Sequence, residues 1–287
     1  MLLSTLSFAV VNALIKTLGH LPAFEKVFFR CLVSLVISIG YLRKIKVNLL
    51  GNNRRYLLLR GLAGSIALTL FFIVIERIPL ASAVTIQYLS PIFTAIFGLY
   101  MLREKVSVPQ WVFFLISFLG VVIMKGFDHR IDNFSLGLGI LSACLSGIAY
   151  NCIRKCKDTD HPVVIVLYFP LVATPLLSLF IYLFHFGPFA GEFPMKVWET
   201  PQGWDWTVLL IIGLFTQLAQ VSMTKALHLD NAAPVTNMKY LGSVFALMIG
   251  FFFFNESFQI MALLGIATVL LGVLLNVTYK EKVKKTP

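Results

Sequence analysis

A single lysine, Lys239, lies inside an apolar segment, residues 235–254, whose letters are VTNMKYLGSVFALMIGFFFF. At the centre of a membrane-spanning helix a lysine costs about 2.5–3.5 kcal/mol, so its retention indicates a function. Helical spacing places Thr236, Tyr240 and Ser243 on the same face as the ammonium group. This pattern predicts a polar stripe that binds a substrate anion, carries a titratable proton, or does both. The alternative is a structural lysine, paired with a buried carboxylate or with backbone carbonyls.

Amide, hydroxyl and phenol side chains occur at helical spacing on other apolar segments as well. Gln87 and Tyr88 share a face on the segment 80–102, and Gln217 and Gln220 share one on the segment 206–228. Amides in lipid have little to hydrogen-bond except each other, water or a solute, and a tyrosine adds an aromatic wall. Tyrosines that only pack, and an asparagine that only holds helices together, are the alternatives. We expect a solute-binding site formed by Asn12, Gln87, Tyr88, Gln217, Gln220, Thr236, Lys239 and Tyr240.

Charged residues near the ends of the apolar segments are expected to be structural. Arg30 would pair with Glu25 or with a carbonyl, because it lies only a few residues into its segment. Glu104 and Glu256 would close their helices. Lys16 either extends its ammonium group to the membrane surface or lies on the path by which a solute arrives.

The elements that must position these residues can be inferred from the composition. Of 287 residues, 58% are hydrophobic and 13% are charged, against about 25% charged in soluble proteins. So little polar surface cannot cover a soluble core, and the composition therefore predicts a polytopic membrane protein surrounded by lipid. A spanning helix needs about 20 apolar residues. Ten segments qualify, at 1–18, 23–42, 56–75, 80–102, 108–125, 134–154, 162–184, 206–228, 233–254 and 260–279.

The distribution of positive charge predicts the orientation of these segments. The net charge of +11 is spread between apolar segments and over the tail KEKVKK, which argues against a nucleic-acid partner. With both termini inside, fourteen lysines and arginines fall in inner loops and five in outer loops. This bias predicts an integral protein of the cytoplasmic membrane with inner N- and C-termini. The long loop 185–206 would then be an ordered external cover.

Motifs for catalysis or metal binding do not occur in the sequence. None of the four cysteines forms a CxxC pair, and the five histidines lie in loops or at segment ends without HxxxH spacing. Neither a Walker motif nor a dinucleotide-binding glycine pattern occurs. We therefore expect no enzymatic activity, no cofactor and no metal site.

An internal repeat appears when the sequence is shifted by 152 residues. Tyr88 then meets Tyr240 (240 − 88 = 152), and Gln87 meets Lys239. A second shift (151 − 12 = 139) places Asn12 over Asn151. Each half would hold five helices, an odd number, so the halves would insert with opposite orientations, as in secondary transporters with a site near the bilayer midplane. The predicted units are two five-helix repeats, residues 1–126 and 133–280, and a basic cytoplasmic tail, 281–287.

The repeated stretches resemble the EamA-type repeats of the drug/metabolite transporter superfamily. They are ASAVTIQYLSPIFTAIFGLYMLREKV and AAPVTNMKYLGSVFALMIGFFFFNES, and the stretch FEKVFFR places Arg30 at the family's usual arginine position. The second half has Gly242-Ser243 where the first has Ser90-Pro91, so one half alone keeps the proline. The resemblance implies that helices one, three, four, six, eight and nine line a central cavity, with helices five and ten outside it.

Together these features predict an all-α membrane protein of ten transmembrane helices that works as a secondary carrier by alternating access. Lys239 would hold an anionic group, by preference a carboxylate, and Tyr88 and Tyr240 would wall the apolar part. An amino acid, an amino-acid derivative such as a sulfonium metabolite, and an organic acid all fit as the small-molecule substrate. A coupling proton, a counter-substrate and facilitated diffusion stay open. A multidrug or toxic-metabolite exporter and a non-transport membrane scaffold are the alternatives.

Overall fold

The structure, a computed structural model, describes residues 2–103, 106–192, 195–228 and 241–285. Every regular element in these ranges is a helix. The helices of the first half are α1 (Leu2–Thr17), α2 (Ala23–Lys44), α3 (Arg54–Arg77), α4 (Leu80–Gln87), α5 (Ser90–Met101) and α6 (Val108–Phe127). Those of the second half are α7 (Asn133–Cys156), α8 (Pro162–Ile181) with its π-helical continuation η1 (Tyr182–Phe186), α9 (Trp204–His228), α11 (Leu241–Phe254) and α12 (Ile260–Lys285).

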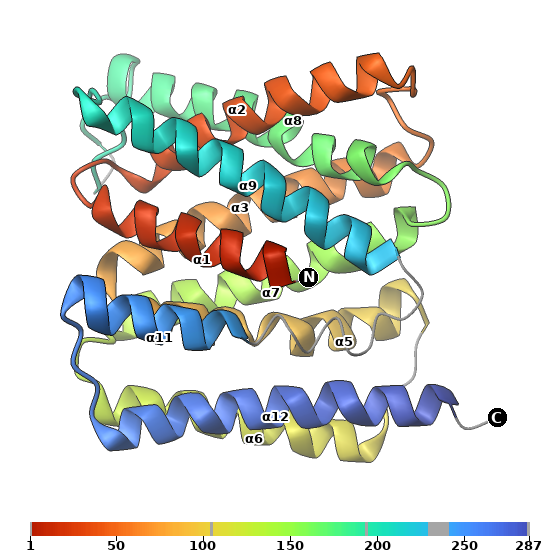
Figure 1. The fold of residues 1–287 in the computed structure, drawn as a ribbon, viewed down its shortest axis with the longest axis vertical. Coiled ribbons are helices and arrows are strands. Elements are labelled where there is room, and N and C mark those ends of the chain that lie inside the picture. The colour runs from red at the N-terminus through yellow and green to blue at the C-terminus, as the bar shows by residue number, and fades with distance from the viewer. Residues whose placement is uncertain (1, 104–105, 193–194, 229–240, 286–287) are drawn as a thin grey trace.

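The helices lie side by side in an up-and-down bundle (Figure 1). At one extreme of the long axis α2 packs against α8, and at the other α6 packs against α12. The remaining helices lie between these two pairs and surround the centre of the molecule. We call the end at which α1 finishes and α2 begins the Lys16 end, and the end at which α2 finishes the Lys44 end.

The expected segment 80–102 is two helices that meet at a break. α4 ends at Gln87 and α5 begins at Ser90, with Pro91 in its first turn. Proline has no backbone N–H and cannot donate to the carbonyl of the residue four positions earlier, which here is Gln87. The ladder of helical hydrogen bonds is therefore interrupted at the carbonyl of Gln87, next to Tyr88.

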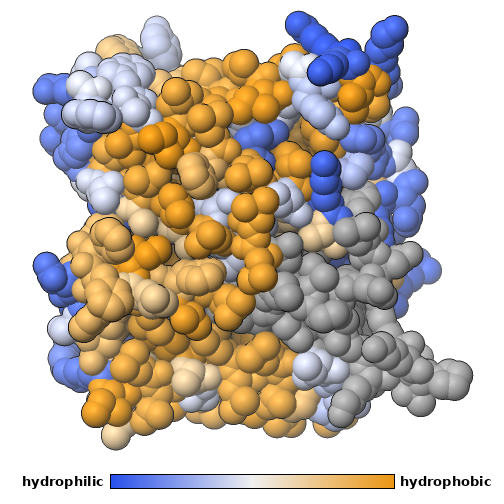
Figure 2. All heavy atoms as spheres, in the orientation of Figure 1, coloured by the Kyte–Doolittle hydropathy of each residue, from blue (hydrophilic) through white to orange (hydrophobic). Residues whose placement is uncertain are grey.

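The surface of the bundle is apolar over a broad central area. Figure 2 shows hydrophobic residues across the middle of one face and hydrophilic residues at its two sides. Large side chains stand fully outward, among them Val36 at 65% exposure and Phe253 at 79%. Among the described residues, six helical stretches are long and apolar enough to cross a bilayer if α4 is joined with α5 and α8 with η1, and three more are apolar but shorter. The chain is an integral membrane protein, as its composition predicts.

Packed side chains and ion pairs fill the Lys16 end of the bundle. Val11, Ile15 and Leu18 of the α1 region are buried in one apolar cluster with residues of α2, α3 and α4. Lys16 forms an ion pair with Glu256, which follows α11 and also accepts a hydrogen bond from the backbone N of Leu80 at 3.0 Å.

A second ion pair lies at the same end. Lys26 of α2 is fully buried and pairs with Glu76 of α3. Its Nζ also donates to the carbonyls of Ile15 and Leu18, at 3.2 and 3.0 Å. Because both pairs join different helices, they hold this end of the bundle closed.

Glycines allow two helix pairs to approach closely. A Cβ placed on Gly61 of α3 would lie 2.6 Å from the side chain of Val172 on α8. A Cβ on Gly213 of α9 would lie 2.5 Å from the side chain of Val33 on α2. Close backbone contact through small residues is a common way to pack helices in a membrane.

The tail is the element whose structure differs most from expectation. The sequence predicts a basic tail at residues 281–287 after a helix ending at 279, but α12 continues to Lys285. Lysine and glutamate are good helix formers, and lysines in a last helical turn are favoured by the helix dipole, so the basic stretch extends the helix. The first two residues of the expected cover 185–206 belong to η1. Further along it, the ring centre of Trp198 lies 5.9 Å from that of Phe29 on α2, so this part of the cover packs against the bundle.

Candidate solute-binding cavity

A cavity of about 190 Å³ lies at the centre of the bundle. Residues of α1, α3, α4, α7 and α9 form most of its wall, with one residue each from α2, α5, α8 and α11, and Tyr88 between α4 and α5. No described residue of α6 or α12 lines it, which agrees with the outer position expected for helices five and ten. Its polar lining consists of Ser4, Thr5, Asn12, Arg30, Arg60, Gln87, Tyr88, Ser90, Ser146, Tyr150 and Gln220, and its apolar lining includes Phe8, Leu68, Phe71, Phe169 and Met223.

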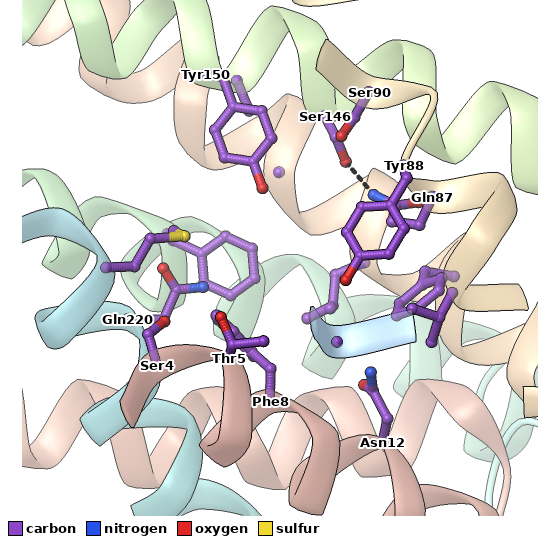
Figure 3. Close-up of a pocket in the computed structure, with 18 of the residues that line it drawn as sticks. Ser4, Thr5, Phe8, Asn12, Gln87, Tyr88, Ser90, Ser146, Tyr150 and Gln220 are labelled. Carbon is purple, nitrogen blue, oxygen red and sulfur yellow. Dashed lines mark hydrogen bonds between the residues drawn. The ribbon is translucent and has the colours of Figure 1, made fainter. Parts of the chain in front are cut away.

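Gln87 is held in place by two serines of α7. Its Nε2 donates to Ser146 Oγ at 2.8 Å (Figure 3). Its Oε1 accepts from Ser142 Oγ at 3.0 Å. These bonds fix the orientation of the amide beside the break between α4 and α5. Gln87 therefore presents a fixed amide edge to the cavity.

Tyr88 extends from the break toward α11. Gly242 stands where any side chain would collide with the Tyr88 hydroxyl, and a Cβ there would also lie 3.3 Å from Thr5. Figure 3 shows the phenol groups of Tyr88 and Tyr150 pointing toward the same space. The aromatic and hydroxyl-bearing wall expected from Tyr88 is present at the cavity.

Asn12 and Gln220 approach the cavity from α1 and α9 (Figure 3). The Oε1 atom of Gln220 is buried and accepts no hydrogen bond from any residue that the structure describes. A buried acceptor without a donor loses its hydration without compensation, so this carbonyl is suited to bind a donor group of a solute.

Two arginines give the cavity its charge. Arg30 of α2 is 2% exposed and Arg60 of α3 is 4% exposed. The guanidinium of Arg30 lies 5.4 Å from the centre of the Phe72 ring, and that of Arg60 lies 4.8 Å from the centre of the Phe169 ring. Within the described part of the chain neither guanidinium forms an ion pair or donates a hydrogen bond, and both Nε atoms are buried without a partner.

Gln217 does not face the cavity. Its Oε1 accepts a hydrogen bond from Ser34, and its Nε2 donates to Ser38 Oγ at 2.9 Å. Both serines belong to α2, so this glutamine joins α9 to α2. The other expected site residues, Thr236, Lys239 and Tyr240, lie outside the described residues.

Comparison with known families agrees with this architecture. The family model described as "EamA-like transporter family" matches residues 1–125 and 133–278. The chain belongs to the EamA-like transporter family. The resemblance drawn from the repeated stretches is thereby confirmed.

Several curated transporters are similar to this EamA transporter over most of its length. The pseudopaline exporter CntI of Pseudomonas aeruginosa is 31% identical over 260 residues, covering 88% of this chain and 86% of the exporter. Human solute carrier family 35 member G1 is 30% identical, covering 89% of this chain and 71% of that protein. The S-adenosylmethionine uptake transporter of Rickettsia conorii is 25% identical, covering 98% of this chain and 92% of that transporter. This EamA protein is a transporter of small metabolites and not an enzyme.

A solved crystal structure shares the fold. It aligns with a TM-score of 0.62 at 15% identity and covers 98% of this chain and 99% of that chain. At this identity the likeness concerns the fold alone.

Arg60 lines the cavity of this EamA transporter but is not among the site residues expected from the sequence, and the same is true of Ser146 and Tyr150. A sequence signal was available, because Arg60 lies inside the apolar segment 56–75 and an ionisable residue there indicates function. For Arg30 the sequence predicts a structural pairing with Glu25 or a carbonyl, and this is not what the structure contains. Glu25 instead accepts a hydrogen bond from the backbone N of Glu199 at 3.0 Å, which leaves Arg30 to the cavity.

Proposed function

We propose that this transporter is a secondary carrier that moves a small organic anion across the cytoplasmic membrane by alternating access. Ten spans would form two inverted five-helix repeats, with both termini inside. The observation that carries the proposal is the central cavity, because helices of both halves of the chain line it while one end of the bundle is closed. A carrier needs a site that each side of the membrane reaches in turn, and a cavity between two repeats provides one.

The pattern of helix contacts supports the inverted repeat. Under the shifts of 152 and 139 residues, α3 corresponds to α9, the broken pair α4 and α5 to α11, α1 to α7 and α2 to α8. Exchanging the halves then turns the contact of α1 with α9 into that of α7 with α3, and both occur. The contacts of α3 with α8 and of α9 with α2 are related in the same way.

The glycine contacts repeat this relation at the level of single residues. Gly61 and Gly213 differ by 152 positions (213 − 61 = 152). The valines that they contact, Val172 and Val33, differ by 139 (172 − 33 = 139). One close contact is therefore the repeat-exchanged copy of the other, as expected for two halves that pack by the same rule.

The closed Lys16 end supports an assignment of the conformational state. With the N-terminus inside, this end faces the exterior, and the cavity lies between it and the Lys44 end. We propose that the structure is the state whose external side is closed. Transport would then require the pairs Lys16–Glu256 and Lys26–Glu76 to separate.

The expected site residues keep their roles as part of this proposal. Lys239 would bind the anionic group of the solute, and Tyr88 with Tyr240 and Thr236 would form the wall beside it. Asn12, Gln87 and Gln220 supply polar contacts from three different helices. Gln217, bonded to Ser34 and Ser38, would position α9 rather than touch the solute.

The comparisons support a fold that serves either direction of transport, since one relative is named an exporter and another an uptake transporter.

The test is flux into liposomes that contain the purified protein. Lys225, an exposed residue of α9 that does not line the cavity, is the control lysine. Saturable uptake of an organic anion, lost in Lys239→Met and retained in Lys225→Met, supports the carrier. Unsaturable flux would indicate a channel, and no flux of any solute would leave the scaffold alternative.

A further inference from the structure

No carboxylate of the described residues pairs with either buried arginine of the cavity. Both are at least 96% buried (100 − 2 and 100 − 4), and neither has an ion-pair or hydrogen-bond partner in the described ranges. Asp and Glu do not occur among the described residues that line the cavity. A buried guanidinium stays protonated, and burying it without a counter-charge is strongly unfavourable. A chain that keeps two such groups in one cavity is prepared for an anion that arrives from outside.

The surroundings position each guanidinium without neutralising it. The rings of Phe72 and Phe169 support the two cations through cation–π contacts. Gly64, one turn after Arg60 on α3, leaves space for that side chain, since a Cβ there would lie 3.3 Å from Arg60 Nη1. The planar fork of an arginine held in this way matches the two oxygens of a carboxylate.

We propose that Arg30 and Arg60 are the specificity-determining residues of this cavity and that they bind a solute with two carboxylates. The inference rests on the proposed function and names its substrate class. The arginines come from different helices, α2 and α3, so each would bind one carboxylate, and Lys239 would add a further contact to one of them. Leu68 and Phe71 line the same cavity and suit the carbon frame between the two charges.

A phosphate group is the other common dianion, and the structure favours it less. Phosphate sites in proteins are usually built from free backbone N–H groups at a helix N-terminus. Arg30 and Arg60 lie inside their helices, well past the free amides of the first turn. The charged groups of the described lining are therefore two side-chain forks, each of which can pair with one planar carboxylate.

The experiment measures binding by the thermal stability of the purified full chain, because a ligand that binds only the folded state raises Tm. Succinate, succinamate and succinamide share a carbon skeleton and carry two, one and no charges. Glutarate and adipate, each with its monoamide and diamide, extend the series in length, and inorganic phosphate is the competing dianion. We expect stabilisation by at least one dicarboxylate at millimolar concentration, with its monoamide weaker by roughly 10-fold to 100-fold in affinity.

Variants separate binding from a structural role. Arg30→Gln and Arg60→Gln should each weaken dicarboxylate binding by roughly 10-fold to 100-fold. Each should also raise the Tm of the ligand-free protein, by about 2 °C or more, because one uncompensated buried charge is removed. Arg77→Gln is the matched control, since Arg77 also lies over a ring, Phe134 at 5.3 Å, but is partnered by Ser135 and lies outside the cavity. It should change neither dicarboxylate affinity nor its charge dependence.

Three results would overturn the proposal. In the first, no dicarboxylate stabilises the protein. In the second, a dicarboxylate and its diamide stabilise it equally. In the third, only phosphate stabilises it. A lower Tm of ligand-free Arg30→Gln and Arg60→Gln with unchanged affinity would mark the arginines as structural. Failure of the proposed function looks different, because dicarboxylates would then stabilise the protein and depend on both arginines, yet would not cross a liposome membrane.

Discussion

Replacement of Glu256 by glutamine tests whether the Lys16 end is a gate. Glu256 is 7% exposed, and its carboxylate accepts from the backbone N of Leu80 and pairs with Lys16, whose side chain is 18% exposed. Gly250 leaves room for that carboxylate, because a Cβ there would lie 2.5 Å from Glu256 Oε2. Glutamine keeps the shape and can still accept from Leu80, so Glu256→Gln removes the charge and little else.

The expected effect depends on the burial of this pair. Breaking a fully buried ion pair by removing one partner costs about 3–5 kcal/mol. Lys16 is partly exposed and keeps a hydrogen bond to the carbonyl of Ile78 at 3.2 Å, so the loss here should be smaller, about 1–3 kcal/mol. If the pair forms only in the externally closed state, this corresponds to a shift of roughly 5-fold to 150-fold in the population ratio toward external opening.

Chemical accessibility of a cysteine at position 11 measures that shift. Val11 is fully buried in the apolar cluster of the Lys16 end, so Val11→Cys should react with an impermeant maleimide only when this end opens. Glu256→Gln should raise the external labelling rate at least about fivefold in a background without the four native cysteines. Lys196→Gln breaks the exposed pair with Glu199, whose side chains are 75% and 45% exposed, and should change nothing. An unchanged labelling rate in Glu256→Gln, with the fold intact, would refute the gate.

Three further predictions concern the site and its scaffold. Lys239→Met should abolish saturable uptake of the organic anion while Lys225→Met retains it, and equal uptake by both would remove Lys239 from the site. Gly242→Val should displace the Tyr88 hydroxyl and weaken solute affinity by roughly tenfold in a thermal-shift titration, whereas unchanged affinity would place Tyr88 outside the binding site. Gly61→Val and Gly213→Val should each destabilise the protein by about 1–3 kcal/mol in thermal unfolding, because each new side chain would overlap a valine of the neighbouring helix. The proposed repeat predicts effects of similar size, so a large effect of one variant alone would contradict it.

Most of the fold could be predicted because lipid leaves few alternatives. Each span must satisfy its own backbone, so runs of apolar residues predict helices, and turn residues and charges predict their ends. The break beside Tyr88 depends on one missing N–H at Pro91, which periodicity alone does not detect. The extension of α12 to Lys285 was missed because a basic stretch after a span predicts topology and helix formation equally well.

The candidate site was predicted in part, because spacing identifies a polar face but not what that face meets. Asn12, Gln87, Tyr88 and Gln220 line the cavity as expected from their spacing. Gln217 lies on the same polar face of α9 as Gln220, yet two serines of α2 satisfy its amide. The role of Arg30 depended on whether Glu25 was free, and that depends on a contact with Glu199, 174 residues later in the chain.

The two repeats that we propose would share a scaffold but differ in the groups at equivalent positions. Arg60 corresponds to position 212 (60 + 152), where Ile212 is fully buried, and Arg30 corresponds to position 169 (30 + 139), which is Phe169. Phe169 is the residue whose ring supports the guanidinium of Arg60. At these two positions the first half of the chain supplies arginines, whereas the second half supplies Ile212 and the aromatic face of Phe169. In this proposal, symmetry serves the alternation between two states, whereas a solute with a fixed charge pattern needs an asymmetric site, and differences at positions such as Arg30 and Arg60 provide that asymmetry.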